Sequence, residues 1–171
     1  DLNRNHIFKW NEPGHSTYVC DQTYRGPTPG SEPEIQAYEN FVRSIIPDQR
    51  RPGDNDPAPI TTTGLLINLH NVTEGVVLVP WGWTTALAPN NAHLVAIAEK
   101  FITQTTSPVY NWQYSLYPVS GNTRDWGYGE LGIPSYVIEL YGDDFFSSCS
   151  LLPGIISNML PVLKYAALIS D

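Results

Sequence analysis

The chain has 171 residues, of which 42% are hydrophobic and 12% aromatic, and this is enough to build the core of one α/β domain. Nine Lys and Arg residues against seventeen Asp and Glu residues give a net charge of −8, which excludes nucleic acid and anionic membranes as expected partners. No apolar stretch is expected to reach the roughly 20 residues that span a bilayer, and no basic and apolar leader precedes Asp1.

The composition is compatible with secretion. The chain is poor in Lys and rich in Pro, Trp and Tyr, and its two cysteines, Cys20 and Cys149, lie far apart in the sequence. These cysteines can form a disulfide in an oxidising compartment, or both can remain free thiols. We therefore expect a secreted or extracellular protein and leave the state of the cysteines open.

The first five residues, Asp-Leu-Asn-Arg-Asn, place an amide beside a guanidinium at Asn3 and Arg4. This pair of groups suits the bidentate capture of a small carboxylate. The alternative interpretation is a solvated polar terminus without a binding role.

A helix is predicted over about residues 32–46. Ser31 and Glu34 have the spacing of a capping box, and Pro47 ends the segment. The residues expected to face the core are Ile35, Tyr38, Val42, Ile45 and Ile46. Residues 47–60 are rich in Pro, Gly, Asp and Arg, and they predict an exposed loop within a single domain.

The rest of the chain alternates between strand and helix patterns. Short apolar runs at 65–69, 76–79 and 136–140 predict buried strands. Helices are predicted over about 90–105 and from near Pro153, the second with Pro161 inside it. The residues expected to face inward from the first of these helices are Val95, Ala98, Phe101 and Ile102. This alternation predicts a three-layer α/β/α fold with a mixed, mostly parallel sheet.

Two polar residues stand in these apolar strands. His70 closes the run Leu65–Leu69, where a histidine can be a metal ligand or a proton carrier, although none of the four histidines belongs to a short-range metal motif. Glu139 lies between Ile138 and Leu140, and its burial indicates either a base beside a metal or a buried salt bridge. Because ligands gather beyond the carboxyl ends of parallel strands, we expect both side chains at one site.

Seven short motifs occur in a specific order and at specific intervals. They are Asp-Leu-Asn-Arg-Asn at 1–5, Thr-Tyr-Arg-Gly at 23–26, Ser-Glu-Pro-Glu at 31–34, Leu-His at 69–70, Pro-Trp-Gly-Trp-Thr at 80–84, Ser-Gly-Asn-Thr-Arg-Asp-Trp-Gly-Tyr at 120–128 and Ile-Glu-Leu at 138–140. Over nearly the whole chain they resemble the carboxypeptidase A family of zinc metallocarboxypeptidases. The resemblance implies a Zn²⁺ cofactor and hydrolysis of the C-terminal bond of peptides and proteins.

The resemblance also implies roles for single residues. His70 matches the third zinc ligand, and Glu139 matches the carboxylate that activates the zinc-bound water. Asn3 and Arg4 match the pair that grips the terminal carboxylate of the substrate. Tyr117 matches the mobile tyrosine that covers the bound C-terminal residue.

Arg124 bears on specificity. It occupies the position that matches the floor of the pocket for the C-terminal side chain, where an arginine would favour Glu or Asp by a charge-assisted bond. Alternatively, Arg124 turns outward or pairs with Asp125 or Glu130. Other residues expected to line this pocket are Thr123, Asn122, Leu116 and Val137.

The chain lacks the upstream His-x-x-Glu that supplies the first two zinc ligands of the family. We therefore expect the C-terminal part of a catalytic domain, inactive without the N-terminal half as its partner. Two other functions remain open: a non-catalytic peptide-binding or scaffold protein on this fold, and an amidohydrolase of the related branch. A carbohydrate platform at Trp81-Gly82-Trp83 is a further alternative to a place for these rings in the core or a cleft wall.

Overall fold

The sheet at the centre of the molecule is mixed. The computed structural model describes the chain except residues 52, 74, 108, 143 and 171. In the described part, β1 (Leu66–Thr73), β2 (Val76–Leu78), β3 (Asn111–Gln113) and β4 (Ser135–Tyr141) form a sheet in the order β1-β4-β2-β3. β1 runs parallel to β4 and β2 parallel to β3, whereas β2 and β4 are antiparallel. The expected mixed, mostly parallel sheet is confirmed.

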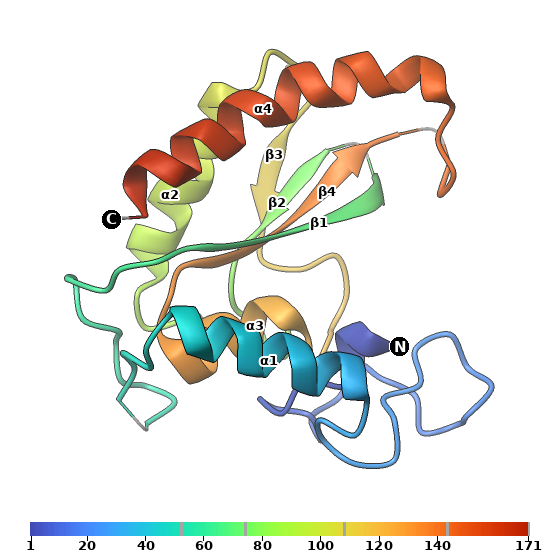
Figure 1. Ribbon diagram of the computed structural model, residues 1–171, viewed down its shortest axis with the longest axis vertical. Coiled ribbons are helices and arrows are strands. Elements are labelled where there is room, and N and C mark those ends of the chain that lie inside the picture. The colour runs from blue at the N-terminus through green and yellow to red at the C-terminus, as the bar shows by residue number, and fades with distance from the viewer. Residues whose placement is uncertain (52, 74, 108, 143, 171) are drawn as a thin grey trace.

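Helices cover both faces of this sheet (Figure 1). α2 (Asn91–Gln104) and α4 (Leu152–Ile169) lie on one face, and α1 (Pro33–Ile45) and α3 (Thr123–Leu131) lie on the other. Two short 3-10 helices, η1 (Leu2–Arg4) and η2 (Cys149–Leu151), complete the described elements. The apolar core between the layers is built on large buried side chains, among them Phe101, Trp126, Tyr136 and Ile138. The three-layer α/β/α arrangement is therefore confirmed.

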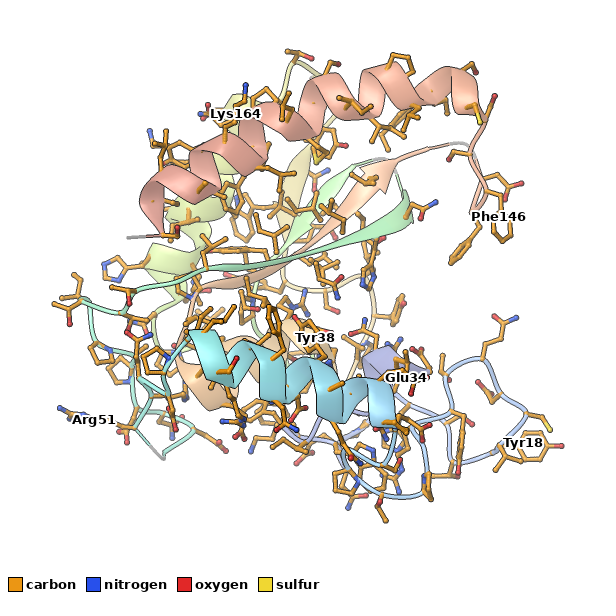
Figure 2. All side chains as sticks on the ribbon, viewed as in Figure 1. Tyr18, Glu34, Tyr38, Arg51, Phe146 and Lys164 are labelled. Carbon is orange, nitrogen blue, oxygen red and sulfur yellow. The ribbon has the colours of Figure 1, made fainter. Side chains whose placement is uncertain are left out.

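α1 lies within one residue of its predicted ends. Ile35 and Val42 are buried, and Tyr38 points from the helix toward the sheet (Figure 2). Ile45, which was also expected to face the core, is 61% exposed, so that part of the prediction is wrong. The helix turns its last apolar residue to solvent because Ile46 leaves the helix in an extended conformation before Pro47.

The predicted capping box is also wrong. Glu32 is the N-cap of α1, and its side chain makes no capping hydrogen bond. The Ser31 hydroxyl instead donates to Glu32 Oε1 at 2.8 Å and accepts from Asn5 Nδ2 at 3.0 Å. The start of α1 is thereby attached to the N-terminal segment rather than closed on itself.

α2 and α4 confirm two of the predicted helices. α2 buries Ala98 and Phe101 as expected. α4 contains Pro161 and buries Met159 and Val162. The expectation that no segment reaches membrane-spanning length is wrong, because Cys149–Ile169 forms 21 residues of mean hydropathy 1.4, long and apolar enough by length and composition. α4 packs against α2 on one side, and only 17% of the apolar window is buried.

The segment 47–60 contains neither helix nor strand in its described residues and is mostly exposed. It is nevertheless attached to the domain. The backbone of Ala58, which is buried, donates to Asn90 Oδ1 at 2.7 Å, and the Arg50 guanidinium lies 4.8 Å from the centre of the Tyr128 ring. The Gln49 N–H also donates to the Leu131 carbonyl at 3.0 Å, so the segment is a loop held to the domain at several points.

Candidate active site

The register of two parallel strands brings His70 and Glu139 together. His70 on β1 is the direct partner of Glu139 on β4, so both side chains emerge on the same face of the sheet. His70 Nδ1 lies 3.6 Å from Glu139 Oε1, and the two side chains are 29% and 13% exposed. This places an imidazole and a carboxylate side by side at the edge of a cavity, as expected for a site at the ends of these strands.

A small cavity of about 40 Å³, which we call the substrate cavity, lies next to this pair. It gathers residues from η1, β1, β2, β4, the start of α3 and the loop before α3. Its lining includes Asn3, Arg4, His70, Leu78, Ser115, Leu116, Tyr117, Val119, Asn122, Arg124, Val137 and Glu139. Almost every site residue expected from the sequence thus reaches one cavity, including Leu116 and Val137.

Arg124 is the most unusual member of the substrate cavity. It lies at the start of α3, is 1% exposed, and none of its three guanidinium nitrogens has a hydrogen-bond partner among the described residues. A Cβ atom at Gly82 would lie 2.0 Å from Arg124 Nη2, so only glycine at position 82 leaves room for the guanidinium. Burial lowers the pKa of Arg124, although Asp125 and Glu139 act in the opposite direction, and an arginine remains charged in such a site.

Of the alternatives for Arg124, an outward orientation and a pair with Glu130 are excluded, whereas a pair with Asp125 is present. Arg124 does not turn outward, and Glu130 instead pairs with Arg43, whose Nη2 lies 3.0 Å from Glu130 Oε2. Arg124 Nε does lie 3.5 Å from Asp125 Oδ1, which is close enough for attraction between the charges but too long for a hydrogen bond. The Asp125 carboxylate therefore balances part of the charge of the Arg124 guanidinium, which still has no hydrogen-bond acceptor among the described residues.

Asp125 is occupied by other donors. Its carboxylate accepts the backbone N–H groups of Gly82 and Trp83 at 2.9 and 3.0 Å and Asn122 Nδ2 at 2.8 Å. Burial raises the pKa of the Asp125 carboxyl, while Arg124 and these donors act against that rise. These bonds hold the Gly82-Trp83 backbone in place. They also leave the Asp125 carboxylate with few free lone pairs that could accept from the Arg124 guanidinium.

Asn3 and Arg4 form the polar rim of the substrate cavity. Arg4 Nε donates to the Gly14 carbonyl at 3.1 Å, and Nη1 donates to the Asn3 carbonyl at 2.8 Å, so the guanidinium is held in one orientation. Its central carbon lies 5.9 Å from the centre of the Tyr117 ring. The alternative of a solvated terminus is contradicted, because Arg4 is 4% exposed.

Tyr117 separates the substrate cavity from a second, apolar depression. This side chain is 59% exposed and lines both hollows. Trp81 and Trp83 both line the second hollow, and Trp81 is in addition 3% exposed and stacks on Phe8 at 5.3 Å between ring centres. The arrangement agrees with a place for these rings in the core or a cleft wall.

Asn122 and Thr123 differ in their placement. Asn122 lines the substrate cavity and also caps α3, since its Oδ1 accepts the Asp125 N–H at 2.9 Å. Thr123 is buried and is not among the described residues that line the cavity; its N–H and hydroxyl bond Asn3 Oδ1 at 2.9 and 3.1 Å. Thr123 therefore supports a rim residue instead of forming the wall.

Residues 1–158 match a family model described as zinc carboxypeptidase. The chain belongs to the zinc carboxypeptidase family. It is 33% identical to human mast cell carboxypeptidase A over 140 residues, which are 78% of this chain and 30% of that protein. It is 32% identical to human carboxypeptidase A6 over 154 residues, which are 85% of this chain and 31% of that protein.

A solved structure of thrombin-activatable fibrinolysis inhibitor (TAFI) has the same fold. It matches with a TM-score of 0.79 at 24% sequence identity, over 99% of this chain and 41% of that chain. This zinc carboxypeptidase chain spans about 30% of the length of the curated relatives it matches.

The residues present fit only part of a zinc site. Among the described residues, no three His, Cys, Asp or Glu side chains are grouped so that they could hold a metal ion. The His70 imidazole is one potential zinc ligand, and the Glu139 carboxylate lies beside it. No second histidine completes the group among the described residues. A three-ligand site therefore needs donors beyond those in this part of the zinc carboxypeptidase.

Some residues of the site were not found from the sequence. Val119, Leu78 and Ser115 line the substrate cavity, and His6 and Glu39 lie behind it as a buried polar pair. Glu39 carried a signal, because it occupies the inward stripe of α1 between Ile35 and Val42.

Cys20 and Cys149 are both exposed and free, so they form no disulfide.

Proposed function

We propose that the full-length protein containing this chain is a zinc-dependent exopeptidase that hydrolyses the C-terminal peptide bond and prefers acidic C-terminal residues. The observation that carries this proposal is the buried guanidinium of Arg124, whose nitrogens have no hydrogen-bond acceptor among the described residues. It shares one cavity with the Asn3 and Arg4 rim and with the pair formed by His70 and Glu139.

Each group has a chemical role in this proposal. Zinc, when bound with His70 as one ligand, supplies a water of lowered pKa and polarises the scissile carbonyl. Glu139 takes a proton from the attacking water and passes it to the leaving amine. Arg4 and Asn3 bind the terminal carboxylate, which restricts cleavage to the last residue, and Tyr117 covers the bound residue.

An acidic side chain is the ligand that Arg124 lacks. Leaving a guanidinium buried without acceptors costs several kcal/mol, and a bound carboxylate would remove that cost through charge-assisted hydrogen bonds. An aromatic or basic C-terminal side chain would leave the charge unpaired or repel it. The proposed preference for acidic residues therefore depends on the buried charge of Arg124 and not on the size of the substrate cavity.

We also propose that the chain is one part of a single catalytic domain whose N-terminal half is its main partner. The eight residues of β1 form an edge of the sheet, and Leu69 on this strand is 42% exposed. An unpaired edge of this length invites pairing with another strand. The remaining zinc ligands would come from that half, so the chain alone would be inactive. A secreted location is supported by the composition.

The release of single residues tests the proposed function. Full-length protein with zinc is incubated with a peptide ending in Glu and with the same peptide carrying a C-terminal amide, and products are followed by mass spectrometry. The proposal predicts stepwise loss of the terminal Glu from the free acid and no reaction of the amide, because Arg4 and Asn3 require a carboxylate. Binding without release would instead support a non-catalytic peptide-binding protein.

A further inference from the structure

A buried histidine lies behind the substrate cavity. His6 is 1% exposed and follows η1 directly, where its ring stacks on Trp126 at 5.3 Å between ring centres. Its Nδ1 lies 2.9 Å from Glu39 Oε1, and its Nε2 lies 2.9 Å from the hydroxyl oxygen of Thr123. His6 therefore bridges α1 and the start of α3.

Thr123 continues this bridge to the rim of the cavity. The Thr123 backbone N–H donates to the side-chain oxygen of Asn3 at 2.9 Å. Because a backbone N–H can only donate, the acceptor must be Oδ1, and the orientation of the Asn3 amide is settled. Its nitrogen, Nδ2, then remains as the donor that Asn3 offers to a ligand in the substrate cavity.

The same bonds place a proton on His6 Nε2. The Thr123 hydroxyl lies 3.1 Å from Asn3 Oδ1, and since that oxygen carries no proton, the hydroxyl donates to it. The hydroxyl must then accept from His6 Nε2. Glu39 Oε1 lies 2.9 Å from His6 Nδ1 and also accepts the Ile7 N–H at 3.4 Å. His6 therefore donates to Thr123 through Nε2 and bonds Glu39 through Nδ1.

We propose that His6, held between Glu39 and Thr123, is a positioning residue that fixes the Asn3 amide for the carboxylate of the substrate. The inference rests on the proposed function, since it assigns a purpose to Asn3 in substrate binding. A chain of bonds from Glu39 through His6 and Thr123 to Asn3 runs through three buried side chains and ends at the half-buried Asn3 amide. Loss of a side-chain link leaves the Asn3 amide held by the Thr123 backbone N–H alone and weakens capture of the substrate.

Kinetics of Thr123 variants in the full-length protein test this role. Thr123→Val keeps the shape but removes the hydroxyl, and with a peptide ending in Glu it raises KM by about tenfold while kcat stays within about twofold. Thr123→Ser restores the hydroxyl and returns KM toward that of the wild type. Thr105→Val is the matched control, because its hydroxyl bonds the Ile102 carbonyl at 2.9 Å at the end of α2, and it leaves KM unchanged.

Nitrogen NMR of His6 provides a readout that does not need catalysis. In the wild-type full-length protein, His6 Nε2 carries the proton that it donates to the Thr123 hydroxyl. A His6 ring without a proton on Nε2, or an unchanged KM in Thr123→Val, overturns the positioning role. A wild-type protein that releases no C-terminal residue overturns the proposed function instead, while the NMR result still reports on the His6 bridge.

Discussion

At the scale of single residues, the candidate site depends on charges that are buried with different degrees of compensation. The Asp125 carboxylate accepts hydrogen bonds from three donors, whereas the Arg124 guanidinium has no hydrogen-bonded acceptor among the described residues. A fully compensated charge stabilises the local structure, and an uncompensated one attracts a ligand of opposite charge. This difference in hydrogen bonding is our reason for proposing Asp125 as a structural residue and Arg124 as a specificity residue.

Replacement of Arg124 by methionine tests this distinction. In the full-length protein, Arg124→Met lowers kcat/KM for a peptide ending in Glu by about 100-fold, because a buried charge-assisted bond is lost. The value for a peptide ending in Phe does not fall. Arg43→Met is the control, since Arg43 is part of a half-exposed pair with Glu130 and should not change the preference. An equal loss on both peptides would contradict the assignment.

Replacement of Glu139 by glutamine tests its role as a base. Glu139→Gln keeps the size of the side chain and lowers kcat by about 10²–10⁴, because the amide cannot take a proton from water. KM for the same peptide changes little, and circular dichroism shows an intact fold. Steady-state kinetics of the full-length protein measure the effect, and a kcat close to that of the wild type would remove Glu139 from the mechanism.

The sequence allowed some of these residues to be predicted and not others. His70 and Glu139 stood out because a polar residue in an apolar strand is rarely accidental, and strand register then joined them. The burial of Arg124 could not be predicted, since it depends on the close approach of Gly82 across more than forty positions of the chain. His6 and Glu39 also pair over a long sequence separation, and neither carries a local motif.

At the scale of elements, the start of α3 organises the cavity. This helix was not predicted, because it is buried on nearly all sides and contains Gly127 and Gly129, so it shows no amphipathic period. The sequence predicted Asn122 as a pocket residue but not as the N-cap of α3. The predicted helices α1, α2 and α4 have one clear apolar stripe or a long apolar run, which explains why they were found.

The cap of α3 can be tested by stability. Asn122→Ala removes the capping bond to Asp125 and the donors to Val119 and Asp125, and it lowers the free energy of unfolding by about 2 kcal/mol. Denaturant unfolding of the full-length protein measures this change. Ser148→Ala is a matched control at the exposed cap of η2 and changes stability by less than about 0.5 kcal/mol. Equal effects would show that α3 does not depend on its cap.

At the scale of the whole molecule, two surfaces are left uncovered by the described residues. β1 is an edge strand without a second neighbour among them, and α4 exposes an apolar stripe of Leu152, Ile156, Leu160 and Leu163. Both features fit a chain that spans about 30% of the length of its curated relatives. The sequence predicted the layers correctly because each layer is set by local patterns, but the apolar length of α4 was underestimated because Pro153 and Pro161 interrupt the run.

Zinc binding by the isolated 171-residue chain tests this view of the molecule. With His70 as its only expected ligand of the site, the chain alone should bind Zn²⁺ weakly, with no stoichiometric transition at micromolar concentrations. Isothermal titration calorimetry measures the affinity, and the full-length protein serves as the comparison. Tight binding of one Zn²⁺ per isolated chain would show that the described residues contain a complete site.

The preference of the wild-type full-length protein for its C-terminal residue tests the central claim most directly. Steady-state kinetics are measured on three peptides that differ only in a last residue of Glu, Phe or Lys. Because the Arg124 guanidinium in the substrate cavity has no hydrogen-bond acceptor among the described residues, kcat/KM is predicted to be at least about tenfold higher for Glu than for either of the others. A higher kcat/KM for Phe or Lys would contradict the account.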